Sequence, residues 1–315
     1  MSTKNLFRET ISNWEDWGRV YQSIPAFSPL AEEIYRRENL PFSPLRHLTP
    51  GTNAVFRAGD TVIKIFFPKE SGLDPAPDFQ NESAVCGYLT EQGISTPRLL
   101  AQGRIEDAYT FFYLITEYTE GQEAGEFLSA ASPEEKRRFV RELKEILGAL
   151  NRPAAGVIPP IDLAQRAAEN PRLSRVPPTL AEELRRRAQK LDLSQRVLVH
   201  GDLTGENLLV TAQKPGKARD LAGFRRLIVI DCADACLAPA WYELGPIVFE
   251  LFRCDPLLLR EFAEGERDFA ERVLDSVCLH DFGADLLRTA AEREGIPCFS
   301  DLAEVKYYVN KKLSN

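Results

Sequence analysis

The stretch VLVHGDLTGENLLV, residues 197–210, places a polar cluster between two short apolar runs. These runs, Val197–Val199 and Leu208–Val210, favour buried β-strands. Asp202 and Asn207 are five positions apart. On a helix that separation turns through about 500°, so the two side chains would not share a face. We therefore expect a loop, fixed at both ends by strands, whose acid and amide converge on one ion or substrate. A solvated turn is the alternative.

A second carboxylate follows in LIVIDCADA, where Ile228–Ile230 predicts a buried strand and Asp231 stands at its end. A carboxylate in that position can face a cleft, whereas one in the middle of a buried run could not be solvated. Asn207 and Asp231 together offer oxygen ligands of the kind that Mg²⁺ prefers. Asp202 would then be left to accept a proton from a hydroxyl group.

One lysine lies inside an apolar run, TVIKIFF at 61–67. Burying an ammonium group without a partner is costly, so Lys64 needs an acid or a phosphate beside it. The helix predicted next, over 78–94, carries Glu82, which is the natural candidate.

Short runs of apolar residues, separated by turn residues, precede and follow that helix in the sequence. The stretches LRHLTPGTNAVFRAGDTVIKIFFP (45–68) and STPRLLAQGRIEDAYTFFYLITEYTEG (95–121) predict strands. The order strand, strand, strand, helix, strand, strand indicates a small α+β lobe with a largely antiparallel sheet.

Helical patterns occupy the rest of the chain. Before residue 41, SNWEDWGRVYQSI and SPLAEEIYRREN predict helices that follow Ser12 and Ser28. After residue 121, SPEEKRRFVRELKEILGALN opens with a capping box of Ser132 and Glu135, and TLAEELRRRAQKL indicates another with Thr179 and Glu182. We expect residues from about 211 to 226 to form a polar turn or a longer hairpin loop.

The bulk composition fits an ordinary globular protein, with 315 residues, 44% hydrophobic and 27% charged. A net charge of −8 argues against a nucleic-acid partner, which usually selects a basic face. The N-terminus lacks the apolar core of a signal peptide, and no apolar run approaches a membrane span. The six scattered cysteines lack zinc spacing and are expected to be reduced thiols. We expect a cytoplasmic protein without a membrane partner.

The lysine, the glutamate, the HxDxxxxN loop and the strand-end aspartate occur in this order along the chain. Together they resemble the protein-kinase-like superfamily. The chain is more similar to aminoglycoside phosphotransferases and their choline-kinase relatives, in which the loop reads HGD, and its motifs are most similar to those of hygromycin-B phosphotransferases. The matching stretches are PGTNAVFRAGDTVIKIFFP, NESAVCGYLTEQGISTPRLLAQG, YLITEYTEG, VLVHGDLTGENLLV, IVIDCADA and LHDF at 279–282.

The resemblance implies a bilobal α+β fold. It would comprise an N-terminal helical extension at 1–40, a nucleotide-binding N-lobe at 41–120, and a helical C-lobe at 121–315 with the catalytic loop and acceptor site. Asp202 would be the catalytic aspartate. Asn207 and Asp231 would hold Mg²⁺ on the nucleotide phosphates.

The resemblance also assigns nucleotide-binding residues to the N-lobe. Lys64 would pair with the α- and β-phosphates and be positioned by Glu82. The turn of Gly51, Thr52 and Asn53 would cover the phosphates. Backbone groups at Thr116, Glu117 and Tyr118, in the connector between the lobes, would meet the adenine.

For several polar residues the sequence allows a functional and a structural interpretation. His200 is expected to structure the loop by hydrogen bonding, and Glu206 to lie on the surface. Asp234 could contact substrate or metal, or have a local structural role. Glu243 could line the acceptor cleft, or serve packing or the surface, while His280 could contact substrate or cap a helix.

The function implied is a small-molecule kinase that transfers the γ-phosphoryl group of ATP to a hydroxyl group. Its acceptor would be a cationic, aminoglycoside-like molecule, and its purpose antibiotic resistance. GTP is an alternative donor, because the connector would read the purine largely through backbone groups. Two other functions stay open: a kinase of another metabolite hydroxyl, such as a sugar or a choline-like amino alcohol, and a non-catalytic nucleotide-binding module.

Overall fold

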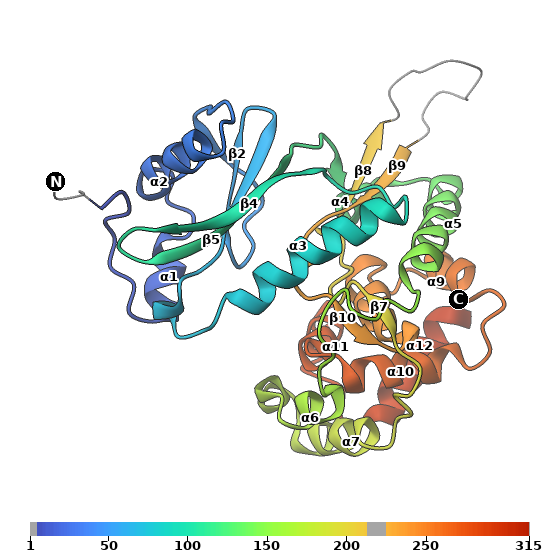
Figure 1. Cartoon of the computed structure of the whole chain (residues 1–315). Helices are drawn as coiled ribbons and strands as arrows, with labels where there is room; N and C mark the ends of the chain where they lie inside the picture. Colours follow the sequence, from blue (N-terminus) through green and yellow to red (C-terminus); the bar gives the residue numbers. More distant parts are fainter. Residues whose placement is uncertain (1–4, 213–224, 315) are drawn as a thin grey trace, which may run out of the picture. The chain divides into compact units, whose positions relative to one another are not determined.

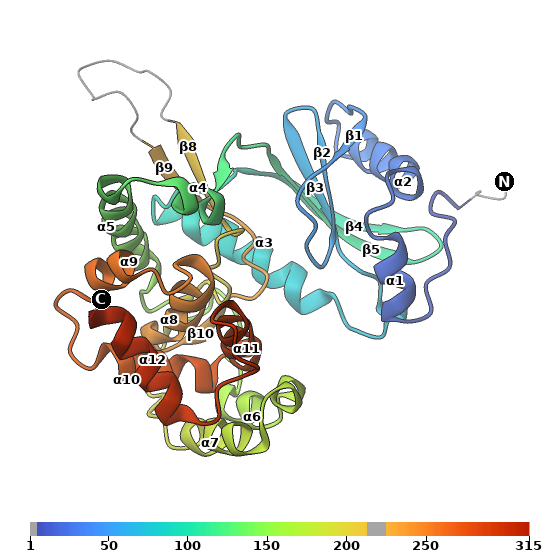
Figure 2. The same cartoon turned by 180° about the vertical axis from the view of Figure 1, so that it is seen from behind.

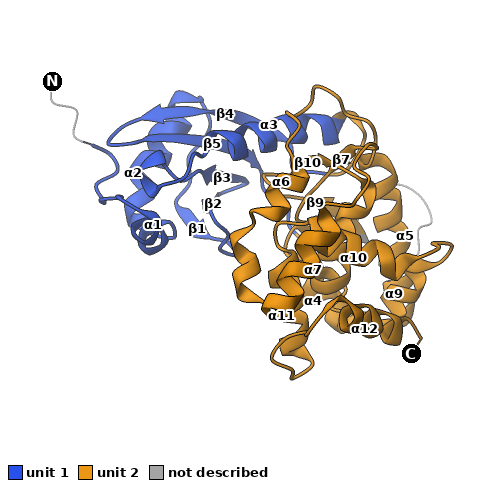
Figure 3. Cartoon of the chain, turned by 90° about the horizontal axis from the view of Figure 1, so that it is seen from below, with its two compact units in different colours: residues 1–90, 96–120 blue, residues 91–95, 121–315 orange. Residues whose placement is uncertain are grey.

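The computed structural model describes residues 5–212 and 225–314, and the chain divides into two compact units (Figure 3). Unit 1 comprises residues 1–90 and 96–120, and unit 2 comprises residues 91–95 and 121–315. Unit 1 thus takes in both the predicted N-terminal extension and the predicted N-lobe. The functional division into an extension, an N-lobe and a C-lobe stays a prediction.

Unit 1 is built on a five-stranded antiparallel sheet of order β1-β2-β3-β5-β4 (Figure 1; β1 and β3 are labelled in Figure 2). The predicted succession of three strands, a helix and two strands is confirmed. Gly59, with φ of +66°, helps to turn the chain between β2 and β3. The elements of the sheet region are β1 (Leu45–His47), β2 (Ala54–Ala58), β3 (Thr61–Ile65), the short 3₁₀ helix η1 (Lys69–Ser71), α3 (Ala76–Glu91), β4 (Leu99–Glu106) and β5 (Thr110–Glu117).

Two helices precede this sheet and pack against it, α1 (Trp14–Val20) and α2 (Ile24–Arg37) (Figure 2). The second helix follows Ser23 and not Ser28, so it begins five residues earlier than expected; the Ser23 side chain accepts a bond from Ala26 N–H, and a proline occupies the first turn. The core shared by the helices and the sheet is rich in fully buried aromatic rings: Phe7, Phe27, Phe56 and Phe111. Each such ring contributes about 1.5–3 kcal/mol by its burial.

Unit 2 is mainly helical and contains two small antiparallel sheets, of order β6-β8-β9 and β10-β7. Helix α10 packs against α7, α11 and α12. The strands are β6 (Gln122–Glu123), β7 (Val197–Val199), β8 (Leu208–Ala212), β9 (Arg225–Val229) and β10 (Cys236–Ala238). The longer helices are α4 (Ala124–Ala130), α5 (Pro133–Leu150), α6 (Leu163–Ala168), α7 (Pro178–Ala188), α9 (Pro256–Ala263), α10 (Phe269–Leu279), α11 (Gly283–Arg293) and α12 (Leu302–Ser314). Shorter turns of helix are η2 (Pro171–Arg175), η3 (Ala240–Glu243), α8 (Leu244–Pro246) and the π-helical η4 (Ile247–Leu251).

One of the two predicted capping boxes is confirmed. Ser132 and Glu135 exchange the expected hydrogen bonds at the start of α5. The prediction for Thr179 is wrong, because α7 already begins at Pro178, so Thr179 lies inside the helix and caps nothing. The pyrrolidine ring fixes φ near its helical value and thereby moves the start of the helix forward.

The remaining expectations concern the insert, the cysteines and the helix lengths. β8 and β9 pair from Leu208↔Val229 to Ala212↔Arg225, while most of the predicted turn or hairpin loop, residues 213–224, lies outside the described residues. All six cysteines are free thiols. In the described residues no helix is both long and apolar enough to cross a lipid bilayer.

Candidate active site

Lys64 and Glu82 form a buried ion pair in unit 1. Ile63 and Ile65 on β3 point into the aromatic core, and since side chains alternate along a strand, Lys64 points to the other face. There its Nζ lies 2.6 Å from the carboxylate of Glu82 on α3, with side chains only 9% and 10% exposed. The pairing expected from the sequence is therefore present. Their predicted role toward nucleotide phosphates stays a prediction.

The turn before β2 is held from within by one of its own residues. Gly51 and Thr52 are exposed, but Asn53 is buried, and its Oδ1 accepts a hydrogen bond from Phe67 N–H at 3.3 Å. Any part of Asn53 in phosphate binding would therefore be played by its backbone. A Cβ added at Gly51 would meet no atom within 4 Å, so the chain does not need a glycine there for its own packing. A ligand that approaches the backbone closely would need one.

The predicted connector has its N–H groups engaged in unit 1. Glu117 N–H donates to Arg98 O at 3.0 Å, and Tyr118 N–H donates to Asp60 O at 2.8 Å. The Arg57 guanidinium lies 3.7 Å above the centre of the Tyr118 ring. The carbonyl oxygens are therefore the backbone groups of Glu117 and Tyr118 that could still form a hydrogen bond with a purine.

In unit 2 the loop at 200–207 joins β7 to β8 and brings Asp202 and Asn207 together. The Asn207 amide donates to the Asp202 backbone oxygen at 2.8 Å and to its Oδ2 at 2.9 Å. Both bonds use the amide nitrogen. Within the described part of the chain the amide oxygen accepts no hydrogen bond, and it is the atom that can ligate a metal.

Asp231 stands beside this pair, two residues beyond the end of β9. Ile230 N–H donates to Asn207 O at 3.1 Å, so the chain around Asp231 runs next to Asn207. Asp231 has φ of +57°, in the left-handed region that aspartate tolerates better than most residues. Strain of this kind persists where the surrounding structure holds a side chain in one required direction.

The electrostatics of the loop are dominated by negative charge. The pKa of Asp202 is raised to about 8, first by burial and then by the carboxylates of Asp234 and Asp231, with the bond from Asn207 opposing the shift. A divalent cation beside these carboxylates would lower that pKa again.

The donor set around Asn207 fits Mg²⁺. It offers an amide oxygen and a strand-end carboxylate, which are hard ligands. Among the described residues, no three acidic, histidine or cysteine side chains are near enough to hold an ion alone. Because Mg²⁺ is commonly bound by one or two protein groups together with substrate phosphates, this small set is sufficient. The assignment of Asn207 and Asp231 as ligands stays a prediction.

Beneath the loop lies Glu243, which is 1% exposed. Its Oε1 accepts from the N–H groups of His200 and Gly201, the latter at 3.2 Å. Its Oε2 is buried and has no hydrogen-bond partner in the described residues. Burial raises the pKa of Glu243 to about 7, against the two backbone bonds that lower it. Glu243 therefore neither lines a cleft nor lies on the surface: it holds the start of the loop.

Two buried histidines complete this support. His200 Nδ1 accepts from Asp202 N–H at 3.3 Å, so its Nε2 carries the proton and donates to Ile230 O at 3.0 Å. His200 structures the loop, as predicted. His280, the C-cap residue of α10, is bound to Gly201 O at 2.8 Å through Nε2, and burial lowers its pKa to about 3. At Gly201 itself, φ is +84° and a Cβ would lie 2.0 Å from Asp234 O, so only glycine fits.

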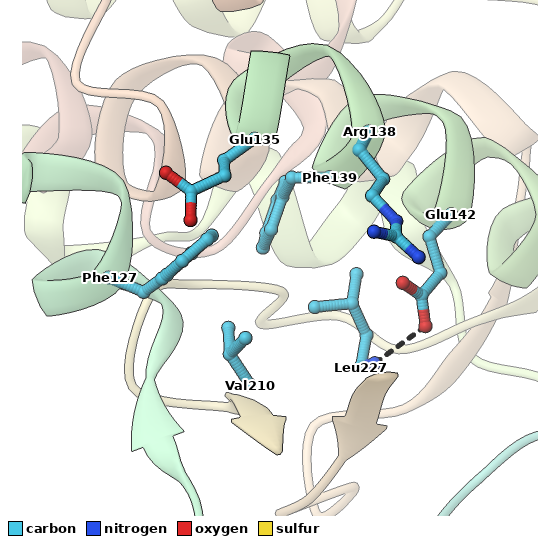
Figure 4. A pocket seen from close by; sticks show the side chains of 7 residues that line it. All are labelled: Phe127, Glu135, Arg138, Phe139, Glu142, Val210 and Leu227. Carbon is cyan, nitrogen blue, oxygen red and sulfur yellow. Dashed lines mark hydrogen bonds between the residues drawn. The ribbon is translucent and has the colours of Figure 1, made fainter. Parts of the chain in front are cut away.

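A small pocket of about 30 Å³ lies between α5 and the β8–β9 pair (Figure 4). It is large enough for bound water and far too small for a nucleotide. At its edge the Glu142 carboxylate accepts from Leu227 N–H of β9 at 2.6 Å. Burial raises the pKa of Glu142. The bond fixes the strand that leads to Asp231. The pocket is lined by Phe127, Glu135, Arg138, Phe139, Glu142, Val210 and Leu227.

The helix-capping alternative for His280 and the packing alternative for Glu243 are confirmed, but the sequence did not indicate that these two residues hold the 200–207 loop, nor that Glu142 holds β9. One signal was available for Glu243, because an acid within the apolar stretch WYELGPIVFEL needs a buried partner. No comparable signal marks Glu142, which lies on an otherwise polar helix face. Its partner is a backbone N–H 85 positions away.

Solved structures with the same fold are aminoglycoside phosphotransferases and related kinases. Aminoglycoside 2'-phosphotransferase-IIIa with GDP is 17% identical and superposes with a TM-score of 0.60 over 93% of this chain and 99% of that chain. A thermostable mutant of aminoglycoside phosphotransferase APH(4)-Ia, with ADP and hygromycin B, is 16% identical, with a TM-score of 0.56 over 90% and 97%. A choline/ethanolamine kinase family protein from Mesorhizobium loti is 18% identical, with a TM-score of 0.50 over 90% and 92%.

These structural similarities establish the predicted α+β, protein-kinase-like fold. Because the sequence identities are low, the similarities do not identify the acceptor substrate. No curated protein sequence matches the chain. The sequence model of one family does match it, over residues 50–277, and the match takes in both the Lys64 strand and the 200–207 loop. The chain belongs to the phosphotransferase enzyme family.

Proposed function

We propose that this protein is a Mg²⁺-dependent kinase that transfers the γ-phosphoryl group of ATP to a hydroxyl group of a cationic, aminoglycoside-like molecule. The observation that carries the proposal is the grouping of Asp202, Asn207 and Asp231 at one end of the β8–β9 pair. Family membership supports phosphoryl transfer as the reaction class.

In the proposed reaction the C-lobe, residues 121–315, handles the proton and the acceptor. Asp202 receives or orients the proton of the acceptor hydroxyl. Asn207 and Asp231 hold Mg²⁺, which neutralises charge on the phosphates when bound. Glu243 and His280 keep the loop in register from beneath, so Asp202 needs little reorganisation.

The N-lobe, residues 41–120, would bind the nucleotide. The Lys64 ammonium, oriented by Glu82, pairs with α- and β-phosphate oxygens. The backbone of Gly51, Thr52 and Asn53 covers the phosphates. Convergence of these groups with the unit 2 loop on one Mg²⁺–triphosphate is part of the proposal.

ATP is the proposed donor and GTP the alternative. The N–H groups of Glu117 and Tyr118 are engaged, so their carbonyl oxygens can only accept hydrogen bonds. Adenine can donate to them from its 6-amino group, and guanine from N1–H and its 2-amino group. The comparison of ATP with GTP in the assay below therefore decides the donor.

The acceptor class follows from charge. Asp234, Asp231 and Asp202 form a negatively charged surrounding at the proposed site of attack, which favours an amino sugar over an anionic metabolite. The same negative charge would suit a choline-like amino alcohol. The structural similarity to the Mesorhizobium loti choline/ethanolamine kinase family protein supports this second acceptor class. Antibiotic resistance would be the physiological role if aminoglycosides are accepted.

The test is an ADP-release assay with Mg²⁺ and ATP or GTP across aminoglycosides, aminocyclitols, choline, ethanolamine and neutral sugars. We expect turnover with hygromycin or another aminoglycoside, dependent on Mg²⁺ and lost in Asp202→Ala. Turnover confined to choline or a neutral sugar would refute the aminoglycoside assignment. Nucleotide binding without turnover of any acceptor would refute the kinase and favour the non-catalytic binding module.

A further inference from the structure

The N-terminal segment of unit 1 is fastened to the sheet at three places. The N–H groups of Leu6 and Phe7 donate to the Asp107 carboxylate at 2.9 and 2.8 Å. The Ile11 N–H donates to the Tyr109 hydroxyl at 2.8 Å. Both of these attachments end on the loop between β4 and β5, which has no predicted functional role.

The third attachment ends on the turn predicted to cover the phosphates. The indole N–H of Trp17, on α1, donates to the backbone oxygen of Thr52 at 2.9 Å. Trp17 is 1% exposed, whereas Thr52 is exposed. An exposed turn is thus tied to a ring that is locked in the core, and the bond is sheltered from competing water.

A second contact from the same helix reaches the turn indirectly. The ring of Trp14 packs edge-on against Phe67, with centroids 5.3 Å apart. Phe67 in turn donates its N–H to the side chain of Asn53. Trp14 and Trp17 are three residues apart and so lie on one face of α1. That face therefore holds the turn at Thr52 and at Asn53.

The bond to Thr52 has a geometric consequence for the next residue. In a planar trans peptide the C=O and the following N–H point in opposite directions. Fixing Thr52 O toward Trp17 therefore directs the Asn53 N–H away from α1. In the described residues this N–H donates to no acceptor, whereas the Asn53 side chain is engaged with Phe67.

We propose that α1 braces the phosphate-covering turn and that Trp17 is a positioning residue, which sets the Asn53 N–H as a backbone donor to a nucleotide phosphate. The inference rests on the proposed function, because it takes the turn as a phosphate site. The Asn53 side chain holds the turn on one side, and the bond from Trp17 fixes the direction of the Thr52–Asn53 peptide from outside the turn. Trp17 supplies that contact before the nucleotide arrives, which lowers the ordering cost of binding.

The experiment compares calorimetric binding of Mg²⁺–ATP and of adenosine to the full chain and to Trp17→Phe. Removing one sheltered hydrogen bond should weaken ATP binding by about three- to ten-fold. Adenosine binding should be unchanged, because adenosine has no phosphate to reach the turn. The matched control is Tyr109→Phe, which removes the hydrogen bonds of the Tyr109 hydroxyl with Ile11 and Glu9 in the same N-terminal segment but none at the turn, and it should bind both ligands like the wild type.

Trp17→Phe that binds ATP as tightly as the wild type, or that loses ATP and adenosine equally, would overturn the brace alone. A wild-type protein that binds neither ATP nor GTP would overturn the proposed function, and the brace with it. A second measurement needs no Trp17 variant. The chain has three tryptophans, and Trp14→Phe and Trp241→Phe identify the Trp17 indole N–H in a ¹H–¹⁵N spectrum by elimination. That resonance should shift with Mg²⁺–ATP and not with adenosine, and an unmoved resonance would contradict the proposal.

Discussion

Unit 1 and unit 2 surround their candidate functional carboxylates with charge in opposite ways. In unit 1 the Lys64 ammonium and the Glu82 carboxylate lie 2.6 Å apart, so each compensates the other. In unit 2 the carboxylates of Asp234 and Asp231 raise the pKa of Asp202, so like charges oppose one another. The comparison indicates that the Lys64–Glu82 pair stabilises unit 1 in the absence of any ligand. The loop of unit 2 lacks such compensation and is arranged to bind a cation from solution.

The largest expected effect is on the rate of phosphoryl transfer, and it tests the unit 2 side of the comparison. Asp202→Asn should lower turnover by about 10²–10⁴-fold, because the acceptor hydroxyl loses its proton acceptor. Its thermal unfolding midpoint should stay equal or rise, since a half-buried carboxyl group beside two other carboxylates is replaced by a neutral amide. A coupled ADP assay and a thermal melt on the same preparation measure both. A variant that keeps wild-type turnover, or that melts far below the wild type, would contradict the prediction.

The next effect is on stability, and it tests unit 1. Lys64→Met should lower the free energy of unfolding by about 3–5 kcal/mol, because the Glu82 carboxylate stays buried without its cation. Combining it with Glu82→Leu should restore most of the loss, since neither charge then remains buried. Urea unfolding of the single and double variants measures the difference.

An exposed pair in the same unit is the control for that experiment. Arg98 and Glu117 are 2.6 Å apart, but their side chains are 69% and 46% exposed. Arg98→Ala should change the free energy of unfolding by less than about 1 kcal/mol. Equal losses in Lys64→Met and Arg98→Ala would show that burial does not distinguish the two pairs, and the comparison would fail.

The smallest effect depends on pH and concerns Glu243. The folded protein holds the pKa of Glu243 at about 7, above the 4.5 of an ordinary glutamate. Between these values the folded state binds more protons than the unfolded state, so the contribution of Glu243 to stability falls as pH rises. Glu243→Gln has no such loss. It should therefore gain about 2 kcal/mol relative to the wild type from about pH 5 to about pH 8.

Urea unfolding across that pH range measures the gain. Glu206→Gln is the matched control, because it removes an exposed acid of the same loop, and the gain of Glu243→Gln should exceed any change that this control shows over the same range. A constant difference for Glu243→Gln would mean that Glu243 is not held protonated under the loop.

The sequence predicts best where the determinants are local or where a charge has one plausible partner. The apolar runs and the turn residues between them predict the succession of three strands, a helix and two strands in unit 1, and the position of Lys64 within TVIKIFF predicts its pairing with Glu82. The polar residues of VLVHGDLTGENLLV predict the convergence of Asp202 and Asn207. For Lys64 the cost of burying an unpaired charge limits the possible partners to an acid or a phosphate, and for the loop the two flanking apolar runs fix where the polar residues must lie.

The sequence fails where two local rules compete or where partners are distant. At α7 a capping pattern at Thr179 competed with Pro178, and the proline determined the start of the helix. The bond from Trp17 to Thr52 joins residues 35 apart, and those from Glu243 reach the loop across more than 40 positions. No periodicity in either segment points to the other, since such contacts depend on how the elements pack.

The bond between Glu142 and Leu227 has a consequence beyond the local geometry of β9. This strand is at the border of its sheet, where bare N–H groups would invite another chain to add a strand. Its Leu227 N–H is taken by Glu142, and its Val229 N–H is taken by Ser95 O at 2.9 Å. The β9 edge is thereby protected at Leu227 and Val229 against intermolecular strand pairing. The protein can keep a short open sheet next to its reactive loop without making that sheet a nucleus for aggregation.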